Sequence, residues 1–331
     1  MNPGMPMAPP GSPQFEVRVA RKTREAQDIC AFELVPVDGT TLPPFAAGAH
    51  IDVQVPGGLT RRYSLCNAPD ERHRYLIGVL REPASRGGSQ AMHELVREGD
   101  TLRISAPRNH FALAADAKHS LLLAGGIGVT PILSMAEHLA AAGAPFSMHY
   151  CVRSADRAAF VDRLRGGTFN AHVHVHFDDG DGTQRADLAQ LIDEPSPGHH
   201  LYVCGPKGFI DAVVALAGKR GWPQDRVHRE FFGGPDVAPG TMDQGFEVRL
   251  ARSGRVVTVP KDVSVVKALA AAGVDVPISC EQGVCGTCLT RIVEGVPEHR
   301  DLYLTPEEQA CNDQFTPCCS RSKTPVLVLD L

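Results

Sequence analysis

Three closely spaced cysteines stand in the segment ISCEQGVCGTCLTRIVE, residues 278–294. Cys280, Cys285 and Cys288 form a C-x4-C-x2-C pattern. Cysteine thiolates bind zinc and iron–sulfur clusters, but a zinc site usually has two C-x2-C pairs or added histidines. A C-x4-C-x2-C pattern followed by a distant cysteine is typical of plant-type [2Fe–2S] clusters. The spacing therefore predicts a [2Fe–2S] cluster in preference to a structural zinc ion.

The fourth ligand of this cluster must lie further along the chain, in the segment TPCCSRS. That segment offers two adjacent candidates, Cys318 and Cys319, and spacing alone does not choose between them. Gly283 and Gly286 stand between the first three thiols. Glycines let backbone N–H groups turn inward toward an anionic centre, which suits a loop that surrounds a cluster.

A second segment with chemical potential is RRYSL, residues 61–65. An arginine can pair with a phosphate, a tyrosine ring can cover a flavin face, and a serine hydroxyl can bond a ring nitrogen. We assign these roles to Arg62, Tyr63 and Ser64, with Leu65 completing the segment, on side chains that alternate along one strand. An ordinary half-buried strand with one exposed arginine explains the same residues, so this segment needs independent support.

That support comes from RGGSQ, residues 86–90, which opens the one helix predicted in this part of the chain. Ser89 is the expected N-cap of the helix. Helix N-termini bind phosphate through free N–H groups, and Gly87 and Gly88 allow close approach. A simple capped helix explains Ser89 but not the two glycines, so we include Arg86, Gly87, Gly88 and Ser89 in the predicted flavin site.

A third segment, LLLAGGIGVTPIL, combines a buried strand, a glycine turn and a helix, over residues 121–133. Such a loop binds the pyrophosphate of a dinucleotide. Pro131 replaces the last glycine of the usual pattern and suits the first helical position, with Thr130 as the expected cap. The predicted nucleotide-binding residues of this loop are Gly125, Gly126, Gly128, Val129, Thr130 and Pro131.

The choice between NADH and NADPH depends on residues that follow the second strand of the same predicted domain. An acidic residue there binds ribose hydroxyls, whereas an arginine can hold the extra phosphate of NADPH. Arg153 and Ser154 favour NADPH on this rule, and Asp156 favours NADH. Nearby, HVHVH places His172, His174 and His176 on one face of a predicted strand. Ordinary packing is the preferred interpretation of these imidazoles, and a metal site is the alternative.

Composition limits the classes of protein that these segments can belong to. The chain has 331 residues and a net charge of −5, which allows two or three domains and argues against a nucleic-acid partner. No apolar run approaches the ~18 residues of a membrane helix. Residues 1–13, MNPGMPMAPPGSP, lack the features of a signal peptide and predict disorder. We expect a cytoplasmic protein whose ten cysteines are thiols or metal ligands.

The pattern of apolar residues divides the chain into three folded parts. Residues 14–114 contain short apolar runs separated by turns, which predict an antiparallel β-barrel. Residues 115–233 alternate buried strands with helices, which predicts a doubly wound parallel sheet covered on both faces. Residues 234–244 have the Gly and Pro content of a linker. Residues 245–331 combine strands, a short helix and the cysteine segment in a small α+β domain.

From about Gln14 to Leu331 the chain resembles the phthalate dioxygenase reductase and vanillate demethylase reductase family. The resemblance lies in R-x-Y-S, Gly-Gly-Ser, G-G-x-G-x-T-P, the C-G-P element of Cys204, Gly205 and Pro206, the EFFG element with Phe231, and the terminal Cys-x-Ser-Arg. It implies that Cys318 is the fourth cluster ligand in a β-grasp ferredoxin-like domain. It also implies FMN in the barrel, NADH in the parallel-sheet domain, and catalytic roles for Ser64 and Cys204 near the nicotinamide.

This order of sites predicts an electron-transfer chain. Hydride carries two electrons and a [2Fe–2S] cluster takes one at a time, so a flavin belongs between them. The resemblance implies the reductase component of a Rieske-type aromatic-ring dioxygenase or O-demethylase, a monomer whose partner is a Rieske non-haem iron oxygenase. The alternatives are a broad NADH:acceptor reductase of the diaphorase kind and a redox-sensing or zinc-stabilised interaction module. Flavin and cluster absorption supports either reductase, and a colourless protein supports the module.

Overall fold

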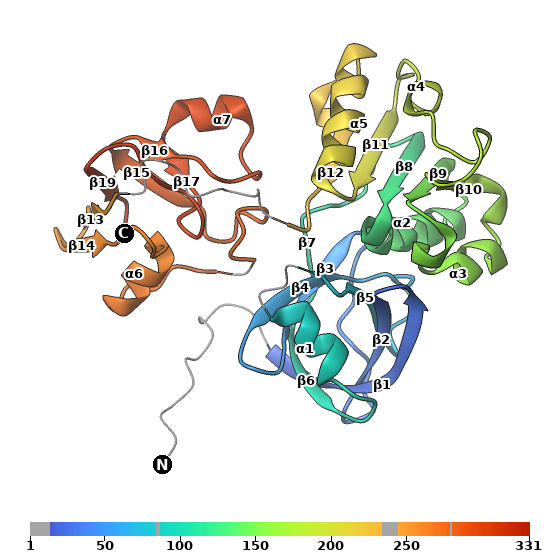
Figure 1. Ribbon diagram of the computed structural model, residues 1–331, viewed down its shortest axis with the longest axis horizontal. Coiled ribbons are helices and arrows are strands. Elements are labelled where there is room, and N and C mark those ends of the chain that lie inside the picture. Colours follow the sequence, from blue (N-terminus) through green and yellow to red (C-terminus); the bar gives the residue numbers. More distant parts are fainter. Residues whose placement is uncertain (1–13, 84–86, 234–243, 279) are drawn as a thin grey trace. The chain divides into compact units, whose positions relative to one another are not determined.

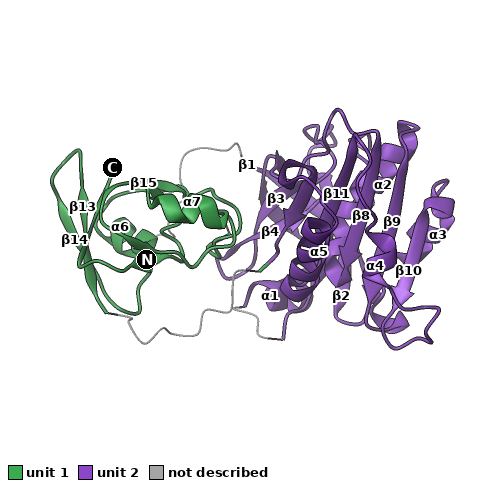
Figure 2. Ribbon diagram, turned by 90° about the horizontal axis from the view of Figure 1, so that it is seen from above, with its two compact units in different colours: residues 1–11, 233–331 green, residues 12–232 purple. Residues whose placement is uncertain are grey.

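The computed structural model describes residues 14–83, 87–233, 244–278 and 280–331, which form two compact units. One unit ends at Phe232 and the other runs from Gly233 to Leu331 (Figure 2). The predicted disordered segment 1–13, Arg86 and all of the predicted linker except Gln244 lie outside the described residues. None of the helices in the described ranges combines the length and apolar composition that a bilayer span requires.

The first unit begins with an antiparallel barrel, as the sequence predicts (Figure 1). Its strands follow the order β4-β3-β6-β1-β2-β5, and β7 pairs with β3. Leu65, just beyond β4, bridges to Ile77 of β5, and this contact closes the barrel. The strands are β1 (Gln14–Ala26), β2 (Ile29–Pro36), β3 (Ala49–Gln54), β4 (Thr60–Ser64), β5 (Tyr75–Leu80), β6 (Thr101–Ser105) and β7 (Arg108–Asn109).

One short helix, α1 (Gly88–Glu94), packs against the barrel core. Met92 of α1 and Val96 just after it are buried among the inward-facing residues of the strands, such as Ile51 and Val53. The alternation of buried and exposed residues along the strands explains why this sequence folds as a barrel with one apolar interior.

The first unit continues into a parallel sheet with the order β10-β9-β8-β11-β12, again as predicted. Alternate residues of the central strand β8 enter different cores: Leu122 packs with α2 and α3, and Leu123 packs with α4 and α5. Helices therefore cover both faces.

The strands are β8 (His119–Gly125), β9 (Phe146–Val152), β10 (Val173–Phe177), β11 (His199–Cys204) and β12 (Val227–Glu230), and the helices are α2 (Val129–Ala141), α3 (Val161–Gly166), α4 (Leu188–Leu191) and α5 (Lys207–Lys219). Short 3-10 turns are η1 (Gly126–Gly128), η2 (Ala155–Arg157), η3 (Asn170–His172) and η4 (Gln224–Arg226).

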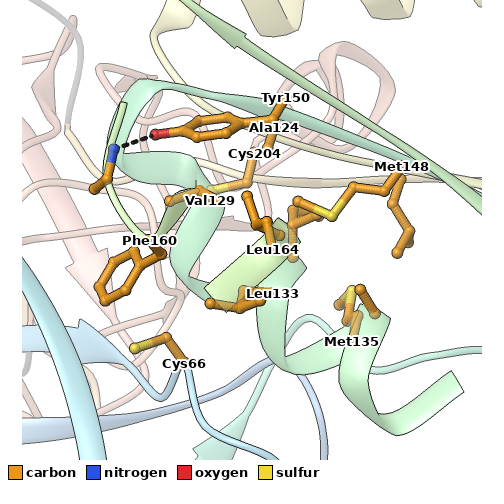
Figure 3. Close-up of a cluster of buried hydrophobic side chains, with 14 of the residues drawn as sticks. Cys66, Ala124, Val129, Leu133, Met135, Met148, Tyr150, Phe160, Leu164 and Cys204 are labelled. Carbon is orange, nitrogen blue, oxygen red and sulfur yellow. Dashed lines mark hydrogen bonds between the residues drawn. The ribbon is translucent and has the colours of Figure 1, made fainter. Parts of the chain in front are cut away.

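The barrel and the parallel sheet share one hydrophobic core. Ile29 and Ala31 of β2 belong to the same cluster as Leu133 of α2 and Tyr150 of β9. Figure 3 shows Cys66, just after β4, in this cluster with Leu133 and Tyr150. Burial of this shared apolar surface holds the two sheets together as one unit.

The second unit is a mixed sheet with the order β14-β13-β19-β15-β17, in which β13 and β19 are parallel. Val265 and Leu269 of α6 are buried in the core of this sheet. This α+β arrangement is the one expected. The strands are β13 (Phe246–Leu250), β14 (Val256–Val259), β15 (Thr290–Glu294), β17 (Gln314–Phe315) and β19 (Val326–Leu329), with a small ladder of β16 (Pro297–Glu298) and β18 (Arg321–Ser322), and the helices are α6 (Val265–Ala271) and α7 (Pro306–Cys311).

Helix α7 is absent from our sequence prediction, although its start carries a recognisable pattern. The Thr305 hydroxyl accepts a hydrogen bond from the Glu308 N–H at 3.3 Å, and the Glu308 carboxylate accepts one from the Thr305 N–H at 2.8 Å. Pro306 occupies the first helical position. This is a capping box with proline, which the letters TPEE would have indicated.

Candidate functional site

Strand β4 presents its two arginines on opposite faces. Arg61 and Tyr63 pair across the ladder with Val53 and Ile51, whose side chains lie in the barrel core. Arg62 pairs instead with Asp52, and its Nε lies 3.6 Å from the Asp52 Oδ1. Because residues two apart share a face of a strand, the arginine on the same face as Tyr63 is Arg61.

Arg61 also lies against the start of α1. A Cβ built on Gly88 would stand 2.4 Å from Arg61 Nε, so only glycine leaves room for this side chain. Gly87, with a φ of 92°, is the N-cap of the helix. The structure thus brings Arg61 and the double glycine together. Arg61 is not among the site residues predicted from the sequence. Its spacing of two residues from Tyr63 indicates that both side chains share a face of the strand.

The expected N-cap role of Ser89 is wrong. Gly87 takes the cap position in the left-handed region, which glycine adopts at little cost, and Ser89 is already inside the helix. Its hydroxyl accepts a hydrogen bond from the Glu82 N–H at 3.2 Å, so Ser89 fastens the preceding segment to the helix.

Ser64, on the other face of β4, meets a residue that our sequence analysis missed. Ser64 is buried, and its Oγ donates to the Glu230 Oε2 at 3.5 Å. Glu230 ends β12, so this contact joins the barrel to the end of the parallel sheet. In the EFFG segment the predicted site residue is Phe231. Its ring is half-buried, and the Arg229 guanidinium lies 6.0 Å from the ring centroid.

Burial controls the charges around Ser64. It raises the pKa of Glu230 to about 7, against the opposing effects of Arg62 and of the Ser64 hydrogen bond. His50, the cross-strand neighbour of Ser64, is fully buried. Burial, reinforced by Arg62, lowers the pKa of His50 to about 2, so its ring is neutral at physiological pH.

The glycine loop and the C-G-P element are in backbone contact. A Cβ built on Gly128 would lie 2.2 Å from the Cys204 carbonyl oxygen, and one on Gly205 would lie 2.9 Å from the Gly125 Cα. A Cβ on Gly125 would stand 3.0 Å from Pro206. These glycines are required because two turns at the carboxyl ends of neighbouring strands pack without side chains between them.

The predicted start of the following helix is wrong by two residues. Helix α2 begins at Val129 with Gly128 as its N-cap, so Pro131 is its third residue and Thr130 its second. The Thr130 hydroxyl donates to the Ile127 carbonyl at 3.0 Å. A Cβ built on Gly78 of β5 would lie 2.8 Å from the Thr130 methyl carbon, so the start of α2 touches the barrel.

Cys204 is fully buried beside Val129 and Tyr150 in the core that the barrel and sheet share (Figure 3). Burial, and then Glu230, raises the pKa of its thiol well above the ordinary value. The thiol is therefore protonated at neutral pH and is not a thiolate nucleophile.

Arg153 lies elsewhere, exposed just after β9. Its carbonyl accepts a hydrogen bond from the Asp179 N–H at 3.0 Å, and the Ser154 hydroxyl donates to Asp156. The three residues weighed for the choice of nucleotide thus gather at the carboxyl end of this strand.

Four of the six cysteines of the second unit form two pairs. Cys280 shares a hydrogen bond with Cys285, and Cys318 shares one with Cys288. Backbone N–H groups point at the sulfurs, with Gln282 N at 3.3 Å from Cys280 Sγ and Thr287 N at 3.5 Å from Cys285 Sγ. Two thiol pairs inside a ring of N–H donors fit a two-iron cluster, which takes four cysteine thiolates.

Cys319 shares a hydrogen bond with Cys318, but its other neighbours differ from those of Cys318. Its Sγ lies 3.3 Å from the Thr316 hydroxyl and 3.8 Å from the Ser320 hydroxyl. A Cβ on Gly283 would lie 2.4 Å from the same sulfur, so Cys319 fills the space behind the loop. Cys318 is buried beside Cys288 and Val266.

Comparison with known proteins identifies the family of this chain. Residues 248–323 match the 2Fe-2S iron-sulfur cluster binding domain, and residues 102–227 match the N-terminal domain of dimethylamine monooxygenase subunit DmmA-like proteins. The vanillate O-demethylase oxidoreductase of Pseudomonas putida is 56% identical over 314 residues, which are 95% of this chain and 98% of that protein. The chain belongs to the vanillate O-demethylase and phthalate dioxygenase reductase family.

Two further relatives extend this result. The phthalate dioxygenase reductase of Burkholderia cepacia is 42% identical over 96% of this chain and 97% of its own length. A solved phthalate dioxygenase reductase, described as a modular structure for electron transfer from pyridine nucleotides to [2Fe-2S], has a TM-score of 0.77 and 41% identity, and the match covers 96% of this chain and 98% of that one. This reductase is accordingly an oxidoreductase of the kind that serves oxygenase systems, and it carries a [2Fe–2S] domain.

The raised pKa of Glu230 leads to a prediction for this reductase. Between pH 4.5 and about 7 the folded state holds a proton on Glu230 that the unfolded state has lost. Stability contributed by this group therefore falls as the pH rises through that window. Glu230→Gln should lessen the fall in the unfolding midpoint across this range, measured by thermal denaturation at several pH values.

In Glu230→Gln the unfolding midpoint should still fall with rising pH, but less steeply than in the wild type. The remaining slope is expected because burial also raises the pKa of Glu25 and Glu137. The exposed Glu94, paired with Arg81, provides a control substitution, Glu94→Gln, that should keep the slope of the wild type. An unchanged slope in Glu230→Gln would assign the effect to another group.

Proposed function

We propose that this reductase passes electrons from NADH through FMN to its [2Fe–2S] cluster, and from there to a Rieske-type non-haem iron oxygenase acting on an aromatic ring or ether. The observation that carries the proposal is the Ser64–Glu230 contact, which joins the strand expected to hold the flavin to the sheet expected to hold the nucleotide. The chemistry that a bound flavin supplies is the conversion of a two-electron hydride transfer into single-electron transfers.

The residues proposed for FMN gather around β4 and the start of α1. Tyr63 offers its ring to the flavin and Ser64 its hydroxyl, as the family resemblance implies. Gly87 is proposed to let the backbone approach a phosphate, and Gly88 leaves room for the Arg61 side chain. Arg61 replaces Arg62 as the proposed phosphate ligand, because Arg61 shares the face of Tyr63 and lies against Gly88. Arg62 is proposed to offset the negative charges of the Asp52 and Glu230 carboxylates.

Arg61→Ala should weaken flavin binding and leave cluster content unchanged. A charge-assisted bond to phosphate contributes about 1.5–3 kcal/mol, which is roughly a tenfold to hundredfold loss in affinity. Flavin affinity should be measured by fluorescence titration of the flavin-free protein, beside Arg62→Ala. Arg103→Ala, at an exposed arginine on β6, is the matched control. A larger loss of flavin affinity in Arg62→Ala than in Arg61→Ala would show that Arg62 is the phosphate ligand.

The nucleotide is proposed to lie across the two packed turns at the carboxyl ends of β8 and β11. Gly126 has no neighbour within 4 Å of its Cβ position and is proposed to face the pyrophosphate, whereas Gly125 and Gly128 let the loop pack against the neighbouring turn, and Val129, Thr130 and Pro131 begin the helix behind it. The C-G-P turn of Cys204, Gly205 and Pro206 lies beside this loop. Cys204, protonated and buried, is proposed to shape the nicotinamide end of the site without reacting. NADH is proposed over NADPH on the family resemblance, with Asp156 as the ribose ligand in preference to Arg153.

In the second unit, Cys280, Cys285, Cys288 and Cys318 are proposed as the ligands, two for each iron. The N–H groups of Gln282 and Thr287 lower the energy of negative charge on the sulfurs. A cytoplasmic setting is proposed because clustered cysteines that bind a metal cluster are typical of reducing compartments. One chain holds all three proposed sites, and we propose that it works as a monomer.

The proposed order of carriers is tested by mixing the holoprotein with NADH without oxygen. Flavin absorption should bleach first and cluster absorption should follow, and one-electron protein acceptors should then be reduced. Cluster reduction that precedes flavin reduction would contradict the order. A preparation without flavin or cluster absorption would contradict the function.

A further inference from the structure

Three histidines lie together on one face of the edge of the parallel sheet. Strands β9 and β10 are parallel, with His174 opposite His149 and His176 opposite Cys151. Residues opposite each other, and residues two apart on a strand, share a face. The ring of His149 is accordingly stacked on those of His174 and His176, with centroid distances of 5.0 and 5.3 Å.

His172, the first histidine of HVHVH, does not belong to this group. It lies in η3, before β10 begins, and its ring contacts Phe146 at a centroid distance of 5.2 Å. Phe146 is in the core on the opposite face of β9 from His149. The group defined by the structure is therefore His149, His174 and His176, in place of the trio that the sequence pattern suggested.

Two nitrogens of this group have the separation of ligands that share one ion. His149 Nδ1 lies 3.0 Å from His176 Nε2. Nitrogens bound to one tetrahedral zinc at about 2.0–2.1 Å each lie roughly 3.3 Å apart. Binding one ion therefore requires a small turn of the two rings, so that their lone pairs converge beside the line that joins the nitrogens and the hydrogen bond between them is lost.

A third ligand is within reach but is not in place. Among the described residues, no three His, Cys, Asp or Glu side chains converge on a single point that would hold an ion. His174 is exposed, so its ring is free to turn about its side-chain bonds toward His149 and His176. Cys151 stands across from His176, with a thiol whose pKa is raised to about 12 by burial, so it remains protonated unless a metal displaces its proton.

We propose that His149 and His176, joined by His174, form a binding site for a divalent transition-metal ion that imidazole favours, with Zn²⁺ as the first candidate. Strand β10 is the edge of its sheet and pairs only with β9 among the described strands. An ion held by both strands clamps this edge. The site is separate from the cluster cysteines and does not depend on the proposed electron-transfer function.

The test is a Zn²⁺ titration of the full-length holoprotein by isothermal calorimetry, repeated with Ni²⁺. Cluster absorption is recorded throughout, because its constancy shows that the cluster cysteines are not the binding site. Substituting a residue that only hydrogen-bonds a metal ligand lowers metal affinity by about 10–100-fold. Substituting a ligand itself should therefore lower Zn²⁺ affinity by at least about tenfold. That loss is expected for His176→Asn and His174→Asn.

His172→Asn is the matched control, since it removes a neighbouring histidine that faces the other way, and it should bind Zn²⁺ as the wild type does. His174 is exposed, so His174→Asn remains informative if substitution of the half-buried His176 disturbs folding. Hydrogen exchange gives a second readout: Zn²⁺ should slow exchange of the amides of residues 173–177 in the wild type and not in His174→Asn. Equal affinities in all variants, or an equal loss in His172→Asn, would overturn the proposal.

Discussion

Replacing Cys318 with serine should remove most of the [2Fe–2S] cluster, whereas replacing Cys319 should leave cluster content near that of the wild type. Cys318 shares a hydrogen bond with Cys288, the last cysteine of the C-x4-C-x2-C segment and a proposed ligand, and is buried with it. Cys319 points at Thr316 and Ser320 behind the loop. A serine oxygen is a harder ligand than a thiolate, so it holds iron–sulfur clusters poorly.

The measurement is iron content per chain, together with visible absorption and the EPR signal after reduction. Cys311→Ser, at an exposed thiol on α7, is the control and should retain the full cluster. The flavin should remain bound in all three variants, because the flavin and the cluster belong to different units. A Cys319→Ser protein without cluster, beside a Cys318→Ser protein that keeps it, would reverse the assignment.

Much of this fold follows from patterns that are local in the sequence. Alternating apolar residues predict the barrel strands, and strands that alternate with helices predict the parallel sheet, because each pattern determines which side of an element is buried. The cysteine spacing likewise predicts the [2Fe–2S] domain, since a loop of that length sets where its thiols can meet.

The features that the sequence did not predict arise from contacts between distant segments. Glu230 is 166 positions from Ser64, and nothing in the letters EFFG indicates that the two side chains meet. His149 is 27 positions from His176, and only the pairing of β9 with β10 brings them to one face. The choice of Arg61 over Arg62 required the ladder between β3 and β4, which fixes the face to which each side chain belongs.

The helix starts were wrong for a more local reason. Ser89 and Thr130 are good capping residues by type, but Gly87 and Gly128 precede them and take the cap positions. Gly87 does so in the left-handed region, and Gly128 is held by its contact with the Cys204 carbonyl. Side-chain propensity gives way here to backbone geometry that favours glycine.

A truncated protein that ends at Gly233 should keep its flavin and still be reduced by NADH. The buried clusters of the first unit contain only residues up to Trp222, and those of the second unit contain only residues from Phe246 onward. Among the described residues, removal of the second unit therefore takes no side chain from the cores around β4, the glycine loop or Cys204. The truncated unit should unfold at nearly the temperature of the same unit in the full chain, since the removed residues belong to none of its hydrophobic cores.

The same truncation should lose electron delivery to one-electron protein acceptors such as cytochrome c, because it lacks every cysteine of the proposed cluster. Small dyes should still be reduced directly by the flavin. The measurement is anaerobic stopped-flow bleaching of the flavin by NADH, run beside a cytochrome c assay on the same sample, with the full-length protein as control. Failure of the truncated protein to reduce its flavin would show that the first unit does not contain a complete NADH–flavin site. Cytochrome c reduction at the full-length rate would show that electrons leave from the flavin, and the cluster would then have no place in the path to that acceptor.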